Sequence, residues 1–307
     1  MSDNRRLVSF VIPFFDCQGH LARAVESVFA QSGDDFELVL VNDGARDRSL
    51  EQARRLVEKA PCPVTLVSQA NRGPGAARNL GARRARGTWV WFLDCDDELL
   101  ADALTQVRPL LAAGPPPMLV AGGHLACSPD GRTRRHSPGR LRGDPIADTR
   151  AFLRKRLGGF SHGALIFARS LFERHGYPET VRNNEDLIFI AQILAQYPCR
   201  TLSQPLAKIH THPDSLRHRL PPSDHSEKLT RLLFDEGTLP DALQSLRKGF
   251  LTGRRLSRFR ALYRAGQEAE ARLLYRRTIR EHPAALLQWP YLRKYLRLLI
   301  RRGRHAN

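Results

Sequence analysis

Acidic side chains stand where apolar runs end in the first hundred residues of this 307-residue chain. The run VIPFF is followed by Asp16, LVLVN by Asp43, and WVWFL by the cluster DCDD, Asp94 to Asp97. Carboxylate oxygens are the ligands that Mg²⁺ and Mn²⁺ prefer in proteins. A divalent cation meets the negative charge that accumulates on a departing diphosphate. The cluster therefore predicts a site for a metal ion and a diphosphate.

The spacing within DCDD favours two of its carboxylates as metal ligands. In an extended segment the side chains of Asp94 and Asp96 share a face, so that one ion contacts both. The alternative is that these acids only cap a helix that begins near Leu99. The motif alone does not decide between them.

The elements that would position these acids alternate between short apolar runs and amphipathic stretches, which is typical of βαβ units around a parallel sheet. Expected strands cover residues 8–13, 37–42, 64–68 and 88–93, and Leu21, Val25, Val28 and Phe29 share one helical face between the first two. Such sheets bind ligands beyond the carboxyl ends of their strands. The acids and the loop QANRGPGAARN should therefore converge on one site.

The middle of the chain predicts a helix over residues 101–112, a break at GPPP, and strands at MLVAGG and ALIFAR. Between these strands, residues 128–143 are expected to form a loop. Its five arginines either contact an anionic acceptor or are simply solvated, and the second interpretation is the commoner one. From about Pro221 onward the pattern is helical.

Taken in order, the motifs PFFD, NDGA, NRG, ARNLG and FLDCDD resemble those of the family-two inverting glycosyltransferases. The resemblance spans about Val8 to Asp97 and continues more loosely to about Ser215. It implies a GT-A fold, a Rossmann-like mixed α/β sheet flanked by helices, with a C-terminal helical extension. It also implies a nucleotide-sugar donor and a Mn²⁺ or Mg²⁺ cofactor. The expected catalytic domain is 1–220, with a donor half (1–100) and an acceptor half (101–220), followed by a basic helical region at 221–307.

The resemblance assigns the donor-binding residues position by position. Asp43 accepts a hydrogen bond from the nucleobase, and Asp94 and Asp96 hold the metal. Asp16 replaces the family's usual Asn, and Asn42 replaces the first Asp of a DD pair, so uridine is favoured only weakly. Capping of the helix through Leu21 is an equally good explanation of Asp16. Of the remaining expected donor contacts, Phe15 and Asp16 lie by the nucleobase, Asn71 and Arg78 lie near the base and the diphosphate, and Pro13 and Gly73 complete the set.

An inverting transfer also needs a base that deprotonates the acceptor hydroxyl. The segment RNNEDLIFIAQIL matches the family's ED before a helix, so Asp186 is the expected base, and Glu185 either holds the acceptor or raises the pKa of Asp186. The alternative is capping of that helix by acidic residues. His212, in KIHTHPDSL, is expected to complete the metal shell or to be structural, and His162 to border the acceptor pocket.

The net charge of +18 is concentrated at the C-terminus, where residues 225–307 hold 19 Lys and Arg against 7 Asp and Glu. The segment WPYLRKYLRLLIRRGRH is typical of helices that lie on anionic membranes. It places Tyr291, Tyr295 and Leu299 on one helical line and Leu292, Leu296 and Ile300 beside it, with Arg293, Lys294, Arg297 and Arg301 largely opposite. A helix that packs on the protein with a solvated Arg face is the alternative.

Composition and charge indicate where the protein is located and which partners to expect. Five scattered cysteines, no signal peptide and no long apolar run predict a cytoplasmic protein. The basic C-terminal segment adds the expectation that it is peripheral on the inner face of the plasma membrane. The expected partners are a nucleotide sugar, a glycan or lipid-linked acceptor, and an anionic membrane surface. Two rival classes are a nucleotidyltransferase, which leaves ED unexplained, and a nucleic-acid-binding protein, in which a cleft lined by Asp is not expected.

Overall fold

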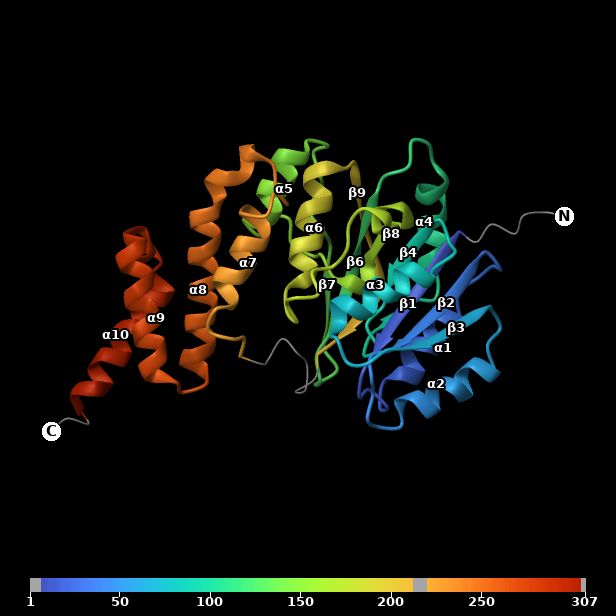
Figure 1. Ribbon diagram of the computed structural model, residues 1–307, viewed down its shortest axis with the longest axis horizontal. Coiled ribbons are helices and arrows are strands. Elements are labelled where there is room, and N and C mark those ends of the chain that lie inside the picture. Colours follow the sequence, from blue (N-terminus) through green and yellow to red (C-terminus); the bar gives the residue numbers. More distant parts are fainter. Residues whose placement is uncertain (1–6, 212–219, 305–307) are drawn as a thin grey trace. The chain divides into compact units, whose positions relative to one another are not determined.

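The computed structural model describes residues 7–211 and 220–304. The chain divides into two compact units, Met1–Ser215 and Leu216–Asn307 (Figure 1). The first contains every strand of the described residues, and the second is helical.

A mixed sheet forms the centre of the N-terminal unit, with the strand order β3-β2-β1-β4-β8-β6-β9-β5. The first four strands are parallel, β8 runs antiparallel to both of its neighbours, and β9 is parallel to β6. The strands are β1 Val8–Phe14, β2 Phe36–Asn42, β3 Val64–Ser68, β4 Trp89–Phe92, β5 Glu98–Leu99, β6 Leu119–Cys127, β7 Thr133–His136, β8 Leu165–Ala168 and β9 Cys199–His210.

The order of the parallel strands fixes where a ligand crevice lies. The chain moves outward from β1 through β2 to β3, and then returns to place β4 on the other side of β1. Because parallel crossovers are right-handed, α1 and α2 cover one face of the sheet and α3 the other. The sheet therefore has a topological switch point between β1 and β4, and their carboxyl ends lead to Asp16 and Asp94. The helices of this unit are α1 Leu21–Phe29, α2 Ser49–Glu58, α3 Pro74–Arg84, α4 Ala103–Ala112, α5 Pro145–Leu153 and α6 Glu185–Gln196, with short 3₁₀ segments η1 His162–Ala164 and η2 Arg169–Glu173.

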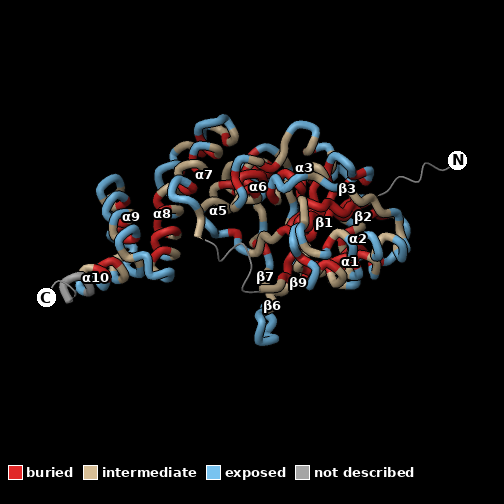
Figure 2. The backbone as a smooth tube through the Cα atoms, turned by 60° about the horizontal axis from the view of Figure 1, so that its bottom comes forward, coloured by how far each residue is buried: buried red, intermediate tan, exposed pale blue. Residues whose placement is uncertain are grey.

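Every residue of β1 and β2 is buried, as expected for central strands covered on both faces (Figure 2). Pro13 fits within β1 because β4 pairs only with Val8 to Val11, so its missing N–H breaks no bond with β4. Helix α3 approaches β1 so closely that a Cβ on Gly81 would lie 2.2 Å from a methyl carbon of Val11. This close approach brings the start of α3 to the carboxyl edge of the sheet.

Strand β6 pairs with two different strands along one edge. Its first half, Leu119 to Ala121, pairs with β8, and His124 to Cys127 pairs with β7. The expectation of a loop over residues 128–143 is therefore wrong at residues 133–136. The strand Thr133–His136 carries no signal in the sequence. Three of its four residues are exposed, so it has no apolar face that would mark it.

The C-terminal unit has its own core, formed mainly by side chains of α8, α9 and α10, among them Phe259, Tyr275 and Leu298. Within the described chain, no helix has the length and apolarity needed to cross a membrane. The helices are α7 His225–Phe234, α8 Arg247–Arg264, α9 Glu268–Glu281 and α10 Trp289–Arg304, with 3₁₀ segments η4 Asp241–Leu246 and η5 Pro283–Leu287.

Candidate active site

The residues after β1 form a small exposed cluster with the loop that follows β2. Asp16 has a left-handed backbone, with φ of 46°, and its two carboxylate oxygens accept bonds from the backbone and the guanidinium of Arg46. These hydrogen bonds, the backbone one first, lower the pKa of Asp16. The same guanidinium lies 5.1 Å from the ring centre of Phe15. The alternative of a helix cap is wrong, because His20 stands at the N-cap of α1.

Asp43, directly after β2, is 4 % exposed and holds the loop before α3. One carboxylate oxygen accepts from the amide of Arg72 at 2.9 Å and from the Gln69 side chain at 2.8 Å, and the other accepts from the amide of Gly73 at 2.9 Å. Three protein donors therefore already use this carboxylate. Each oxygen has two lone pairs, so one acceptor position is open beside Gly73.

The loop itself depends on Gly73, which stands at the N-cap of α3 with φ of 92°. A side chain at this φ would be strained, and a Cβ would also lie 3.2 Å from the Arg182 side chain. The neighbouring Asn71 is exposed, and its carbonyl accepts from Arg182. The start of α3 thus presents backbone amides at the same edge of the sheet as Asp43.

Arg78 connects the two halves of the site. Its side chain is 5 % exposed, and it donates through Nη2 to Asp94 at 2.7 Å and through Nη1 to Glu185 at 2.6 Å. The guanidinium also lies 5.5 Å from the ring centre of Tyr177. Despite its burial, the two carboxylates raise the pKa of Arg78 further. Arg78 thus donates to two protein carboxylates in this structure, and its expected contact with the donor stays a prediction.

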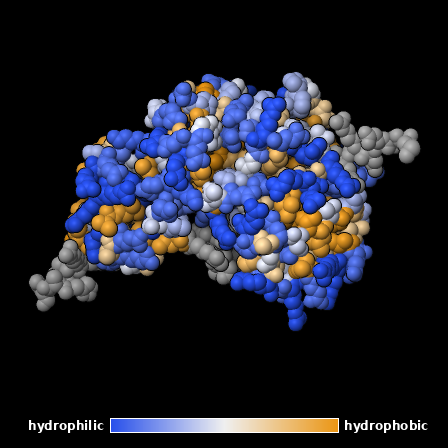
Figure 3. All heavy atoms as spheres, viewed as in Figure 1, coloured by the Kyte–Doolittle hydropathy of each residue, from blue (hydrophilic) through white to orange (hydrophobic). Residues whose placement is uncertain are grey.

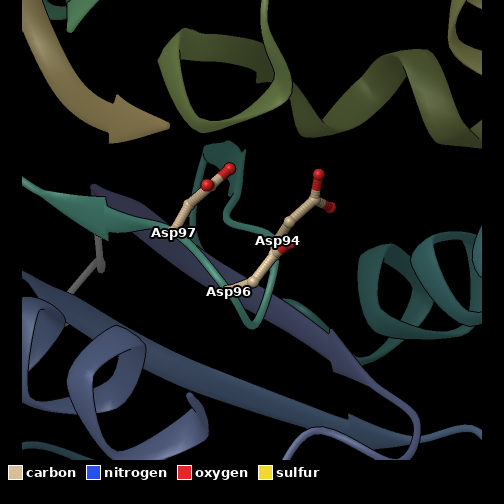
Figure 4. Close-up of side chains that lie close together, drawn as sticks. All are labelled: Asp94, Asp96 and Asp97. Atoms are coloured by element: carbon tan, nitrogen blue, oxygen red, sulfur yellow. The ribbon is translucent and has the colours of Figure 1, made fainter. Parts of the chain in front are cut away.

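The acidic cluster after β4 turns instead of staying extended. The amide of Asp97 donates to the carbonyl of Asp94 at 3.0 Å, which closes a turn. Carboxylate oxygens of Asp94, Asp96 and Asp97 all lie within 4.8 Å of one another. Figure 4 shows Asp94 and Asp97 extending from the same side of this turn. Three hard oxygen donors at this separation could hold a divalent cation, which makes Asp97 a third candidate ligand beside the two predicted ones.

Strand β9 contacts the acidic cluster and the residue that follows it. The carboxylate of Asp97 is buried and accepts from the amide of His210 at 2.8 Å. The His210 ring lies 3.0 Å from Glu98. Burial disfavours the Glu98 charge, but bonds from His210 and Lys208 outweigh it and lower the pKa of that carboxyl. His212, the predicted histidine ligand, lies outside the described residues.

Asp186 lies in the first turn of α6, beside the Arg78 network. Burial, and next the like charge of Glu185, raise its pKa to about 6. Its side chain nevertheless keeps 41 % of its surface open, which leaves the carboxylate accessible to a substrate. His162 Nδ1 lies 3.9 Å from it and Nε2 lies 3.2 Å from the Tyr177 hydroxyl. Burial, with the charge of Arg78, lowers the pKa of His162 to about 3, so this contact involves a neutral imidazole.

Two asparagines that the sequence did not single out shape this region. Asn79 on α3 accepts from the amide of Tyr177 at 2.8 Å and donates to its carbonyl at 2.9 Å, so α3 holds the segment that leads to α6. Asn184, directly before Glu185, has a left-handed backbone with φ of 63°. Asparagine tolerates this conformation better than most residues, and the NN pair before ED was the available signal. Both residues serve to place the ED pair.

Known proteins resemble this chain in sequence and in fold. The sequence profile described as Glycosyl transferase family 2 matches residues 9–176, more than half of the chain. The chain belongs to glycosyl transferase family 2. It is 32 % identical over 204 residues to the succinoglycan biosynthesis protein ExoO of Rhizobium meliloti, an alignment that covers 61 % of this chain and 56 % of that protein. The chain spans about half the length, or less, of the curated relatives it matches.

Solved structures of this fold include TarS of S. aureus, residues 1–349 in complex with UDP. The likeness has a TM-score of 0.65 at 18 % identity, and covers 95 % of this chain and 88 % of that one. The mannosyltransferase PcManGT of Pyrobaculum calidifontis, in complex with GDP-Man and Mn²⁺, gives a TM-score of 0.57 at 20 % identity over 96 % of this chain and 84 % of that one. The predicted GT-A fold is confirmed. Family membership also argues against the nucleotidyltransferase and nucleic-acid-binding alternatives.

Proposed function

We propose that this member of glycosyl transferase family 2 is an inverting enzyme that moves a sugar from a nucleoside-diphosphate sugar to an acceptor hydroxyl. Asp186 is the base, the cluster after β4 holds Mn²⁺ or Mg²⁺, and residues 1–220 form the catalytic part. The acceptor is a glycan or lipid-linked glycan in cell-surface polysaccharide synthesis. The similarity to a succinoglycan biosynthesis protein supports that acceptor class.

One observation carries the proposal: Arg78 joins Asp94, in the acidic cluster, to Glu185, the neighbour of the base. The two groups that an inverting transfer requires therefore lie on either side of one guanidinium. A base on the side of the sugar opposite the leaving group is the arrangement that such a displacement needs.

The residues after β4 fit a divalent cation. Asp94 and Asp96 would hold it, with Asp97 as a third carboxylate and His212 as the predicted histidine ligand. When bound, the ion supplies charge stabilisation for the departing diphosphate. The Mn²⁺ in the mannosyltransferase complex supports this assignment. Arg78, with Nη2 on Asp94, fixes the position of that carboxylate.

The chemistry at the acceptor side follows from Asp186. Its carboxylate takes the proton of the acceptor hydroxyl as the oxygen attacks the anomeric carbon, and the bond to the diphosphate oxygen breaks in the same step. Attack from the face opposite the leaving group inverts the configuration. Burial, and next the charge of Glu185 that Arg78 holds in place, raise the pKa of Asp186, which makes the base stronger than an ordinary aspartate.

The donor side is proposed for the edge formed by the loops after β1 and β2 and the start of α3. Phe15 and Asp16 border the nucleobase together with Pro13 and Asn71. Asp43 has one acceptor position left for a base N–H, although its first task is to hold Gly73. UDP is favoured, which the UDP complex of TarS supports, whereas the GDP-Man complex shows that the fold also accepts a purine.

We further propose a cytoplasmic enzyme, peripheral on the inner face of the plasma membrane, with residues 221–307 as the part that contacts the membrane. The transfer reaction and the membrane contact are separate proposals, and neither depends on the other.

The test of the transfer reaction is product analysis with a panel of nucleotide sugars. Mass spectrometry would detect sugar added to an acceptor glycan or released by hydrolysis, and ¹H NMR of the fresh product would read its anomeric configuration. We expect turnover that requires Mn²⁺ or Mg²⁺, with inverted configuration. A retained configuration, or no turnover with any donor, would contradict the proposal.

A further inference from the structure

Large apolar side chains are exposed along one edge of the C-terminal unit, at η5 and on α10. Leu287 is 86 % exposed, Ile300 63 % and Trp289 59 %, and Leu286 and Leu296 each 42 %. We call these five residues the apolar edge. Figure 3 shows apolar side chains gathered beside strongly polar ones on the visible face of this unit. Hydrophobic side chains that gather in this way on a surface mark an interaction site.

The apolar edge includes residues of only one of the two apolar lines that the sequence suggested for α10. Tyr295 is buried and stacks on Tyr275 with ring centres 4.6 Å apart, and Tyr291 lies 6.4 Å from Phe259. The tyrosine line of α10 therefore belongs to the core of its own unit. The free side of the helix carries Trp289, Leu296 and Ile300 instead.

Basic residues are interleaved with this edge. Trp289, Arg293, Leu296 and Ile300 follow one another at steps of four, three and four residues, so they share one side of α10. Arg293 is exposed, as is Arg297 beside it. The outward side of the helix is therefore apolar and cationic at once.

The charge of this segment lacks internal compensation. From Pro283 to Asn307 the sequence has six Arg and Lys and no Asp or Glu. In the preceding helices the buried arginines are paired: Arg255 with Glu227 and Glu281, and Arg258 with Glu270. The acid-free segment thus stands out from the rest of its unit.

We propose that the apolar edge and the arginines beside it dock on an anionic lipid surface. The inference deepens the peripheral location proposed above and is independent of the transfer reaction. Anionic headgroups attract the basic side chains, while the Trp and aliphatic side chains enter the boundary between headgroups and acyl chains. A second copy of the chain fits less well, because two acid-free basic segments repel each other. A nucleic acid would leave the aliphatic side chains without a partner.

The tryptophans offer a direct test with the full chain. Of the three, Trp89 and Trp91 are buried, and only Trp289 is exposed. Vesicles of phosphatidylcholine with phosphatidylglycerol should shift the Trp emission to shorter wavelength and protect it from acrylamide, whereas phosphatidylcholine alone should do so far less. Trp289→Phe should abolish the emission shift.

Vesicle co-sedimentation then assigns the two parts of the surface. We expect L287S with I300S to lower the apparent lipid affinity at least tenfold, and R293E with R297E to remove the preference for anionic vesicles. Leu273→Ser on α9 is the matched control and should change the lipid affinity less than twofold. Leu273 is 70 % exposed, but it lies outside the acid-free segment, three residues after Glu270. All these residues are exposed, and unchanged circular dichroism and Tm would confirm folding.

Several results would overturn the docking proposal. One is an unchanged Trp emission with anionic vesicles, whether or not the protein sediments with them. Another is an equal emission shift on adding duplex DNA, which would indicate a nucleic-acid surface. A third is that the wild-type chain sediments as a dimer, that I300S sediments as a monomer, and that neither protein binds vesicles. That result would assign the apolar edge to a dimer interface. None of these outcomes bears on the transfer assay, so failure here and failure of the transferase proposal are distinguishable.

Discussion

Arg78 donates to Glu185 over 2.6 Å, although the two residues are 107 positions apart in the sequence. Glu185 has only 7 % of its side chain exposed, and the same guanidinium holds Asp94. A buried carboxylate requires a partner, so the acidic cluster and the base are kept together by a contact that is costly to break.

Replacing Arg78 with Met should reveal that cost. Glu185 would be left as an uncompensated buried charge, and we expect a loss of about 3 kcal/mol in the free energy of unfolding, measured with urea. The double variant R78M/E185Q should regain part of this loss, because it removes the stranded charge. Arg108→Met, which breaks the partly exposed pair with Asp35, should cost less than about 1 kcal/mol. A double variant as unstable as R78M would show that the charge is not the cause.

Asp186→Asn should separate binding from chemistry. The amide cannot take the acceptor proton, so we expect the transfer rate to fall by roughly 10²–10⁴-fold while nucleotide binding stays within about twofold. Initial rates and nucleotide-dependent thermal shifts measure the two effects. Asp34→Asn, an exposed acid after α1, is the control and should keep both. Undiminished turnover by Asp186→Asn would remove the base assignment.

The rate should depend on pH through the ionisation of Asp186. A base works deprotonated, and the pKa of Asp186 is raised to about 6, so the rate should climb with pH through that value and level off above it. At pH 5 only about a tenth of the enzyme would be active by this criterion. The measurement is kcat between pH 4.5 and 8, with folding checked at each point.

Glu185→Gln tests how the charge of Glu185 affects the pKa of Asp186. It removes the like charge that raises the pKa of Asp186 and leaves Arg78, which lowers it. The midpoint of the kcat profile should therefore move to lower pH. A midpoint that stays in place or moves upward would show that Glu185 does not set the pKa of the base.

Asp43→Asn tests whether this residue holds the loop before α3. Asparagine offers one acceptor oxygen where Asp43 uses two, and its NH₂ group would face a backbone donor of Arg72 or Gly73. We expect a loss of about 1–3 kcal/mol in the free energy of unfolding, together with weaker nucleotide binding. If nucleotide binding weakened with no loss of stability, Asp43 would act on the nucleobase alone.

The sequence predicted the parallel half of the sheet well because its strands are short apolar runs with clear ends. β3 is found at the expected residues, and the ends of β1, β2 and β4 lead to the acids that were expected to converge. The carboxyl ends of neighbouring parallel strands share an edge, so pattern and topology together were sufficient here.

The sequence could not predict contacts that form only when the chain turns or when distant elements pack together. An extended segment favours Asp94 with Asp96, whereas the turn adds Asp97 to the cluster. Arg78 was expected on a phosphate, but Glu185 reaches it only through the packing of α6 against the rest of the site. On α10 the periodicity gave two candidate apolar lines, and only the tertiary packing of Tyr295 on Tyr275 identifies which one is core.

Calorimetric titration of UDP, with and without Mn²⁺, tests the central claim most directly, which is that the carboxylates after β4 hold a nucleoside diphosphate through a divalent ion. We predict that Mn²⁺ tightens UDP binding at least tenfold in the wild-type chain and that Asp96→Ala removes this gain. Binding of UDP, GDP and dTDP that is absent, or the same with and without Mn²⁺, would contradict the account.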